Sequence, residues 1–549
     1  MRRRSLNASI KMRDYKFIII TILVILLPAL VLQGCRLPDV FVEPPTEPGS
    51  TATEAPPPTE TPVRIPAEPG QFTLRYVPDS TVNPITGLTR DNIVLSSLIY
   101  ESLFAIDGSL NAEPILCESW STEDNITYTF IIKQDIAMSD GSLLTADDVV
   151  YTLRQAMQRG RFVNRLSIIR SVASDEELTV TVVLNSANSH FIRLLDIPII
   201  GNGSIDDSAP PGTGPYTFAS TRPMWLVRFP MHRDFHRLPV TEIRLLECDD
   251  NVLAELFDSG VLSLLWDDPS DTFDILLNRH HETRLYDTTS LQYIGFNTRS
   301  IALRDADVRR AIGSSLNRRY ITESIMPGQP LAASLALSPA YRLYDTQWEH
   351  TFSDPLIEMS ALLIQAGLED YDNDSFLEYP DGFGGFHKIS LDFIVNSENM
   401  YKVSTAHRIA DTLRLYGIEL IVRELLWDDY LEALETGNFD LYYGEVMLGA
   451  DFDFSPLLLP GSKLNYGSIG NDYYKPFIDA FLSAETDDEE RFAAEQLCDE
   501  ITRRAPFVPI LYKRYAVYTP IAAITGAAPS QSGVFNNFAD WTIDLTMIP

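Results

Sequence analysis

A short acidic segment is the first stretch whose residue types and spacing suit metal chemistry. The sequence DYDNDSFLEYPD supplies alternating carboxylates, from Asp370, Asp372, Asp374 and Glu378. Alternate carboxylates in one loop can wrap a hard cation such as calcium. However, Ser375 stands where a calcium loop has glycine, and Asp381 replaces the bidentate glutamate. The segment is therefore a candidate calcium site, with a solvated acidic turn as the alternative, and no other cofactor is predicted.

Motifs that would carry catalysis are missing from the chain. The sequence contains no GxSxG, HExxH or GxxxxGK[ST] pattern. The stretch HRDF at 232–235 mimics part of a kinase catalytic loop, but the asparagine that should follow and a DFG motif are absent. We therefore expect a binding protein rather than an enzyme, and a lipid-tethered hydrolase is the alternative of a different class.

Cysteine chemistry points to the N-terminal region. A basic leader is followed by an apolar run from Phe17 to Leu32, which is short for a spanning helix. The run ends at Leu-Gln-Gly-Cys, which resembles a bacterial lipoprotein box, so Cys35 is expected to be lipidated after the signal peptide (1–34) is removed. An uncleaved anchor helix is the alternative. Residues 36–70 hold ten prolines, five threonines and five glutamates, a composition typical of an extended tether.

Composition limits the partners and the architecture. The formal net charge is −33, so nucleic acid is excluded as a partner because binding it needs basic patches. About 480 residues follow the tether, more than one core can organise, so two or three subdomains are expected. The remaining cysteines are Cys117, Cys248 and Cys498. They show no zinc spacing, and buried free thiols are expected, with a Cys117–Cys248 bridge as the alternative.

Strand and helix patterns alternate through most of the chain. Strands are predicted at 126–132, 177–184, 291–298 and 418–425 from their apolar alternation. Thr145 is predicted to cap a helix that has Asp147 and Asp148 in its first turn. Another helix is predicted from Ser404 to Gly417. This alternation favours an α/β architecture.

Several separated blocks resemble one receptor family. They are NPI (83–85), LIYESLF (98–104), the stretch 113–153, GTGPYTF (212–218), IGFNTRSIALRDADVRRAIGSSLNRR (294–319) and RFAAEQLCDEITRRAPFVPILY (491–512). In this order they resemble the family 5 extracellular solute-binding proteins, the peptide and nickel receptors of ABC importers. The resemblance spans nearly all of the mature chain. It agrees with the tether, because such receptors in single-membrane bacteria diffuse away unless they are anchored.

The resemblance implies a two-lobed, periplasmic-binding-protein-like α/β clamshell of the large class II type, with an extra subdomain in lobe I. The implied divisions are 35–70 for the lipidated cysteine and tether, 71–104, 212–292 and 509–549 for lobe I, 105–211 for its extra subdomain, and 293–508 for lobe II. The implied protein is a monomer at the outer face of the cell membrane, held there by its lipid. It captures a peptide and delivers it to the ABC permease subunits.

The resemblance also implies ligand-binding residues. In peptide-binding relatives an aspartate shortly after a strand holds the peptide α-ammonium, and Asp451 in DLYYGEVMLGADFDFSPLL (440–458) falls on that position. Asp453 is the alternative anchor. Ser80 and Thr81, just before NPI, match a loop that contacts the peptide backbone.

A departure from the family concerns the ligand's other end. Dipeptide receptors often use an arginine to hold the ligand's C-terminal carboxylate, where this chain has Met400 with only Lys402 nearby. Oligopeptides are therefore expected rather than dipeptides. Nickel is less favoured as a ligand because the sequence shows no histidine cluster. An oligosaccharide receptor of the same fold is the alternative. Its candidate stacking residues are Trp266, Trp427 and Tyr443.

Overall fold

The computed structural model describes residues 70–77, 81–220, 222–271, 275–352, 359–380 and 385–548. The chain divides into two units, Met1–Arg64 and Ile65–Pro549, and every described residue belongs to the second. Cys35, the signal peptide and nearly all of the tether lie outside the described residues, as does Ser80. Within the described ranges, no helix is both long enough and apolar enough to cross a bilayer.

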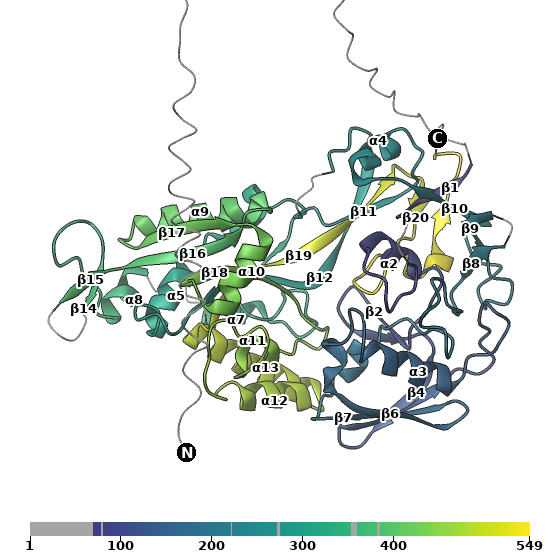
Figure 1. Ribbon diagram of the computed structural model, residues 1–549, viewed down its shortest axis with the longest axis horizontal. Coiled ribbons are helices and arrows are strands. Elements are labelled where there is room, and N and C mark those ends of the chain that lie inside the picture. Colours follow the sequence, from purple (N-terminus) through teal and green to yellow (C-terminus); the bar gives the residue numbers. More distant parts are fainter. Residues whose placement is uncertain are drawn as a thin grey trace, which may run out of the picture. The chain divides into compact units, whose positions relative to one another are not determined.

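A four-stranded sheet, here called the N-terminal sheet, joins segments that are far apart in the sequence (Figure 1). Its strands are β1 (Phe72–Tyr76), β10 (Glu242–Glu247), β9 (Arg222–Arg228) and β8 (Tyr216–Ala219), in that order. β1 pairs in parallel with β10, with Phe72 opposite Ile243. The C-terminal segment completes this core, because Phe538 packs against the rings of Phe72 and Tyr216.

A second four-stranded sheet, the small sheet, is antiparallel throughout. Its strands are β4 (Cys117–Thr122), β5 (Thr127–Ile132), β7 (Thr179–Leu184) and β6 (Ile169–Glu176), in that order. Tyr128, Phe130 and Ile132 alternate into the core as their spacing predicts. The helix α3 (Ala146–Ala156) begins at the predicted cap, Thr145, whose backbone N–H donates to the Asp148 carboxylate at 2.8 Å.

A seven-stranded sheet, the large sheet, organises the rest of the molecule. The order is β11 (Leu265–Asp267), β19 (Phe507–Pro520), β12 (His281–Phe296), β18 (Leu441–Met447), β16 (Ser390–Asn396) and β17 (Glu419–Leu425), with β13 (Leu331–Ala332) also on β19. β12 and β19 are long and pair from His281 opposite Pro520 to Gly295 opposite Phe507. Along β19, Val517 joins the core of the N-terminal and small sheets, whereas Ile510 joins a core of the large sheet. These two strands therefore connect the separate cores.

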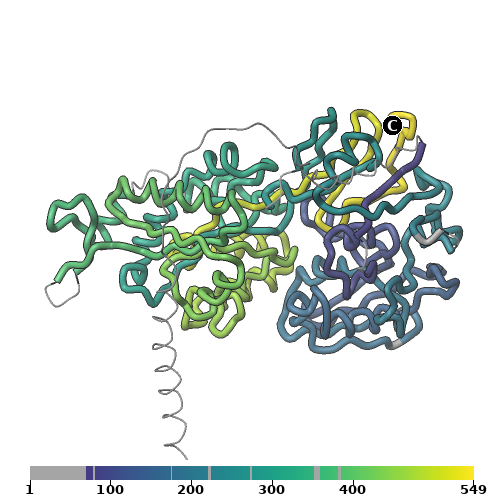
Figure 2. The backbone as a smooth tube through the Cα atoms, turned by 45° about the horizontal axis from the view of Figure 1, so that its top comes forward, coloured from purple at the N-terminus to yellow at the C-terminus, as the bar shows by residue number. Residues whose placement is uncertain are grey.

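Most of the helices belong to the part of the chain coloured teal to yellow-green in Figure 2. They are α5 (Ala306–Ser314), α6 (Arg318–Tyr320), α7 (Thr346–Phe352), α8 (Met359–Gln365), α9 (Met400–Arg414), α10 (Trp427–Thr436), α11 (Ser455–Leu458), α12 (Lys475–Ser483) and α13 (Asp487–Arg504). Of these, α5, α9 and α10 contact strands of the large sheet. The start predicted for α9 at Ser404 was wrong. The helix begins at Met400 because the side chain of Asn399 accepts hydrogen bonds from the backbone N–H groups of Tyr401 and Lys402.

Short elements complete the described structure. They are α2 (Arg90–Ser96), α4 (Leu253–Asp258), β2 (Phe104–Ile106), β3 (Ala112–Pro114), β14 (Glu378–Pro380), β15 (Phe386–Lys388), β20 (Ile524–Thr525), β21 (Thr542–Ile543), η2 (Arg165–Ile168), η3 (Phe191–Leu194), η4 (Asp250–Val252), η5 (Ile321–Ile325) and η6 (Phe538–Asp540). Glycine is required in GTGPY, because a Cβ on Gly212 would lie 2.4 Å from the Tyr100 ring and one on Gly214 would lie 2.3 Å from Ile99. Both contacts are too close for any side chain.

Candidate functional site

A cavity of about 1110 Å³ is lined by several segments that are far apart in the sequence. The lining stretches lie within residues 93–115, 161–168, 194–198, 232–238, 446–456, 461–464 and 530–540. Pockets for small ligands usually measure about 300–1,000 Å³. This cavity therefore has room for a ligand larger than a typical single metabolite.

Asp451 lies on the wall of this cavity, in the loop that follows β18. The residue is 3% exposed, and its Oδ2 atom accepts a hydrogen bond from Nδ2 of Asn188 at 2.9 Å. No lysine or arginine among the described residues forms an ion pair with it. Burial, followed by the negative charge of Asp453, raises the pKa of Asp451 to about 6. The carboxylate is thus buried without a cationic partner of its own.

Asp453 lines the same cavity two residues further on. Its Oδ1 atom accepts a hydrogen bond from the backbone N–H of Ser455 at 2.8 Å. Burial raises its pKa, whereas the hydrogen bonds from Ser455 lower it. Both predicted anchors therefore line the cavity. Asp453 accepts a hydrogen bond of ordinary length from a nearby backbone N–H, whereas the backbone N–H nearest to the Asp451 carboxylate lies at 3.5 Å.

Basic residues also line the cavity. Arg165 donates to Oδ1 of Asp196 at 2.6 Å. Arg233 donates to both carboxylate oxygens of Glu101, one at 2.9 Å. Burial would raise the pKa of Glu101, but hydrogen bonds from His232 and Arg233 hold it below its ordinary value. These two arginines are therefore neutralised within the protein.

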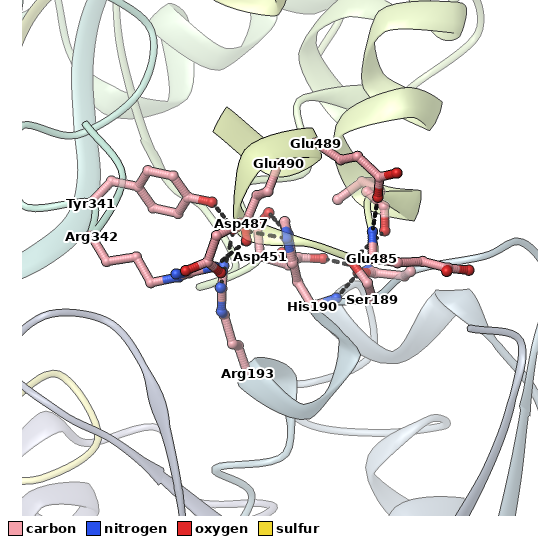
Figure 3. A network of polar contacts seen from close by, with 12 residues as sticks. Ser189, His190, Arg193, Tyr341, Arg342, Asp451, Glu485, Asp487, Glu489 and Glu490 are labelled. Carbon is pink, nitrogen blue, oxygen red and sulfur yellow. Dashed lines mark hydrogen bonds and ion pairs between the residues drawn. The ribbon is translucent and has the colours of Figure 1, made fainter. Parts of the chain in front are cut away.

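A polar cluster contacts the backbone of Asp451 (Figure 3). Glu490 of α13 accepts hydrogen bonds from Tyr341 and from Arg193 of η3, and it also pairs with Arg342. Nε2 of His190 lies 3.0 Å from Oε1 of Glu490, and Nδ1 of the same ring lies 3.4 Å from the backbone oxygen of Asp451. The cluster, here called the Glu490 cluster, therefore links the loop of Asp451 to the segment after the small sheet.

The aromatic residues proposed for sugar stacking do not line this cavity, and the oligosaccharide alternative stays a prediction. Trp266 is buried with its ring centroid 6.0 Å from that of Phe535. Tyr443 is buried and donates to Oε1 of Gln292 at 2.9 Å. Trp427 lies on the surface, stacked on Tyr430. The first two pack in cores because burying their large apolar surface is favourable.

Thr81 has a structural partner in the described chain. Its hydroxyl donates to the backbone oxygen of Ser208 at 2.7 Å, and Thr81 is not among the residues that line the cavity. The neighbouring Asn83 bonds the backbone oxygen of Ile205 at 2.8 Å. The contact that this loop was predicted to make with a peptide stays a prediction.

Among the described residues, no unpaired cation lies at the position that the family resemblance assigned to a carboxylate-binding arginine. Met400 is exposed, and Nζ of Lys402 pairs with Oε2 of Glu445 at 2.8 Å. Burial would raise the pKa of Glu445, but Lys402 and Lys513 lower it to about 2. Lys402 is therefore committed to an internal ion pair.

The acidic loop brings its predicted ligands together. Oxygen atoms of the four carboxylates lie within 4.8 Å of one another, from Asp370, Asp372, Asp374 and Glu378. Ser375 adopts φ +75°, the conformation that favours the glycine it replaces. Several of these oxygens already accept backbone hydrogen bonds, including those from Asp374 and Ser375 to Asp370. Calcium binding stays a prediction, which melting with and without a chelator tests.

The cysteines of the described chain are free thiols. Cys117 and Cys498 are buried, and Cys248 is partly buried. The predicted free thiols are therefore confirmed, and the alternative bridge between Cys117 and Cys248 is not formed.

Comparison with known proteins decides the family. Residues 111–465, well over half of the chain, match the model of the bacterial extracellular solute-binding proteins, family 5 (middle). The chain belongs to this family. It is a solute-binding receptor of the kind that serves ABC importers, and the prediction of a receptor rather than an enzyme is confirmed.

Individual relatives support the same fold. The chain is 23% identical to the probable deoxycholate-binding periplasmic protein YgiS of Escherichia coli, over 83% of this chain and 90% of that protein. The structure of the oligopeptide-binding protein AppA from Bacillus subtilis in complex with a nonapeptide matches with a TM-score of 0.63 and 20% identity, over 87% of this chain and all of that one. A putative peptide-binding protein AppA from Clostridium difficile matches with a TM-score of 0.70 and 18% identity, over 86% of this chain and all of that one. The predicted two-lobed α/β fold is confirmed.

Sequence reasoning missed several residues of the cavity. It also missed Asn188, which does not line the cavity but donates to Asp451 from an ordinary polar stretch. Arg233 belongs to HRDF, a motif that sequence analysis set aside as a chance likeness to a kinase loop. In the structure, His232, Arg233 and Asp234 all line the cavity. The clustering of charged residues in that motif was the signal that could have identified it.

Proposed function

We propose that the protein is a lipid-anchored receptor that captures oligopeptides and delivers them to the permease of an ABC importer. The observation that carries this proposal is the carboxylate of Asp451, which is 3% exposed, lines the large cavity and has no cationic partner among the described residues. A buried charge is costly unless it is paired. A ligand ammonium supplies the missing charge and makes charge-assisted hydrogen bonds to it.

The ligand class follows from the size and polarity of the site. The cavity of about 1110 Å³ accommodates an extended chain of several residues, and Lys402 is not free to fix a carboxylate at a set distance. Peptides of varied length therefore fit better than dipeptides. The relative from Bacillus subtilis was solved with a nonapeptide, which supports this ligand class by similarity.

Calorimetry on four combinations tests the anchor. Asp451→Asn is expected to weaken binding of a free hexapeptide at least about tenfold, because truncating one partner of a buried charged pair costs roughly 2–5 kcal/mol. N-acetylation of the peptide is expected to weaken binding to the wild-type protein similarly and to add little in the variant. Asp411→Asn, an exposed substitution outside the cavity, is the matched control. If acetylation is harmless to wild-type binding, Asp451 does not hold an ammonium and the oligosaccharide alternative gains support.

The anchor to the membrane is a separate part of the proposal. Cys35 follows the apolar run and precedes the proline-rich tether, and the two acyl chains of a diacylglyceryl group hold a protein stably on a bilayer. Cys35→Ala is expected to release the protein from the membrane fraction or to leave its precursor uncleaved. A variant that still takes up radiolabelled lipid and sediments with membranes would contradict this. Sedimentation velocity of the released protein tests the predicted monomer.

A further inference from the structure

Arg161 lines the cavity without a partner of its own. It lies between α3 and η2, and its guanidinium stacks on the ring of Phe162 at 4.6 Å from the ring centroid. Among the described residues, no carboxylate or carbonyl accepts a hydrogen bond from it. The nearby carboxylate of Asp196 is already engaged by Arg165 and by the hydroxyl of Ser532. The edge of the Arg161 guanidinium is therefore free to bind something in the cavity.

Arg161 is accessible to a ligand in the cavity. The residue is exposed in the described structure and lines the cavity wall. A guanidinium stays protonated throughout the neutral range, so it offers a constant positive charge to an anionic partner. Its neighbour Arg165, which also lies over the ring of Phe162, is already paired with Asp196.

The backbone around Arg161 is held in one position. Gly160 adopts φ +77°, and a Cβ there would lie 1.9 Å from the backbone oxygen of Ile85, so no other residue fits. Phe162, which follows Arg161, is buried. The backbone at Arg161 is thus restricted and one face of its guanidinium rests on a buried ring before any ligand arrives, which reduces the entropy lost on binding.

Asp451 and Arg161 line the same cavity. Among the described residues, Asp451 has no cationic partner and Arg161 has no anionic one. A ligand that satisfies both therefore carries a positive and a negative group.

We propose that Arg161 binds a carboxylate side chain of the peptide whose N-terminus Asp451 holds. This inference rests on the proposed function. The flat guanidinium, with one face on Phe162, leaves its edge for a bidentate contact with a carboxylate. The receptor therefore selects peptides with aspartate or glutamate at a position that reaches Arg161 over their amide counterparts.

A glutamate scan tests the selectivity. Alanine hexapeptides with a free N-terminus carry Glu or Gln at each of the first four positions, and their binding to the purified protein is measured by calorimetry. We expect Glu to be preferred over Gln by about tenfold at one position, because hydrogen bonds to charged groups contribute roughly 1.5–3 kcal/mol. Arg161→Met is expected to abolish the preference, and Arg161→Lys to keep part of it. Arg170→Met, an exposed site outside the cavity, is the control that keeps it in full.

The outcomes separate this inference from the proposed function. Gln peptides that bind and are sensitive to N-acetylation support the receptor function. If Glu peptides then bind no more tightly than Gln peptides at any position, the inference is overturned. It is also overturned if the tighter binding of Glu peptides persists in Arg161→Met. If no peptide binds, the proposed function fails, and glutarate becomes the probe. Glutarate that binds the wild-type protein but not Arg161→Met then supports an anion site at Arg161. Absence of glutarate binding to the wild-type protein overturns it.

Discussion

Asp451 connects ligand binding to pH. Burial, and then Asp453, raise its pKa to about 6 from an ordinary value of 3.8. The carboxylate is therefore protonated below about pH 6 and ionised above it. An ammonium ligand binds the ionised form, because the neutral acid offers no charge to pair with.

The first prediction follows from the raised pKa of Asp451, because only its ionised form pairs with the ligand. Affinity for a peptide with a free N-terminus is expected to rise by about tenfold per pH unit below the pKa and to level off by about pH 7, while the peptide amine, with a pKa near 8, stays charged. Calorimetry at pH 5, 6 and 7 measures it. The profile of Asp451→Asn is expected to be flat over this range. A wild-type profile that is equally flat would show that Asp451 does not titrate in the binding reaction.

At the residue scale, resemblance predicted the two carboxylates but not their surroundings. Asp451 and Asp453 follow a strand in a block that the family shares, so their place in the cavity could be anticipated. Arg161 could not, because what distinguishes it is the absence of a partner, and only the folded arrangement shows which carboxylates are already engaged. The burial of Trp266 and Tyr443 could not be anticipated either, because sequence does not reveal which way an aromatic side chain turns.

Among the elements, α13 and η3 are connected through the Glu490 cluster. The Glu490 side chain is 6% exposed, and burial alone would raise its pKa, but His190 and Arg193 hold the pKa well below its ordinary value. Arg342 and Tyr341 complete its contacts. One carboxylate therefore neutralises two arginines from different parts of the fold.

Glu490→Gln is expected to destabilise the protein. The amide leaves Arg193 and Arg342 without a buried counter-charge, and removing one partner of a buried ion pair costs about 3 kcal/mol or more. Thermal melting at pH 7 measures the loss. Asp488→Asn, an exposed position two residues earlier in α13, is the control and is expected to change stability by less than about 0.5 kcal/mol. Equal melting temperatures for the two variants would contradict the assigned role.

Element boundaries were predictable where a local cap defined them. Thr145 with Asp148 in the first turn gave the start of α3 correctly. The start of α9 was missed because Asn399 caps it five residues before the predicted start at Ser404. The parallel pairing of β1 with β10 has no local signal at all, since about 170 residues separate the two strands.

The whole molecule carries a formal net charge of −33. Such a field attracts cationic peptides and repels anionic ones at long range, and salt screens it. The local charge of Arg161 therefore acts against the field of the rest of the protein. Long-range charge sets the rate of encounter, whereas buried contacts set the rate of release.

Added salt is expected to change the association rates of two peptides in opposite directions. Raising ionic strength from roughly 20 to 300 mM should slow association of a lysine-rich hexapeptide by about threefold or more and speed association of a glutamate-containing one. Stopped-flow mixing with a fluorescent label at the peptide C-terminus measures both rates. A shared response of the two peptides would indicate that long-range charge does not govern capture.

The position of β19 in the large sheet has a consequence for the order of biosynthesis. β19 lies between β11 and β12 in that sheet, although it spans Phe507–Pro520 and its neighbours were synthesised more than two hundred residues earlier. The sheet therefore lacks an inner strand until the ribosome has nearly finished the chain. Domains whose strands are contiguous can fold while the rest is still being made. Here both lobes share a strand that is made near the end of synthesis, so the nascent polypeptide stays without its completed core for most of translation.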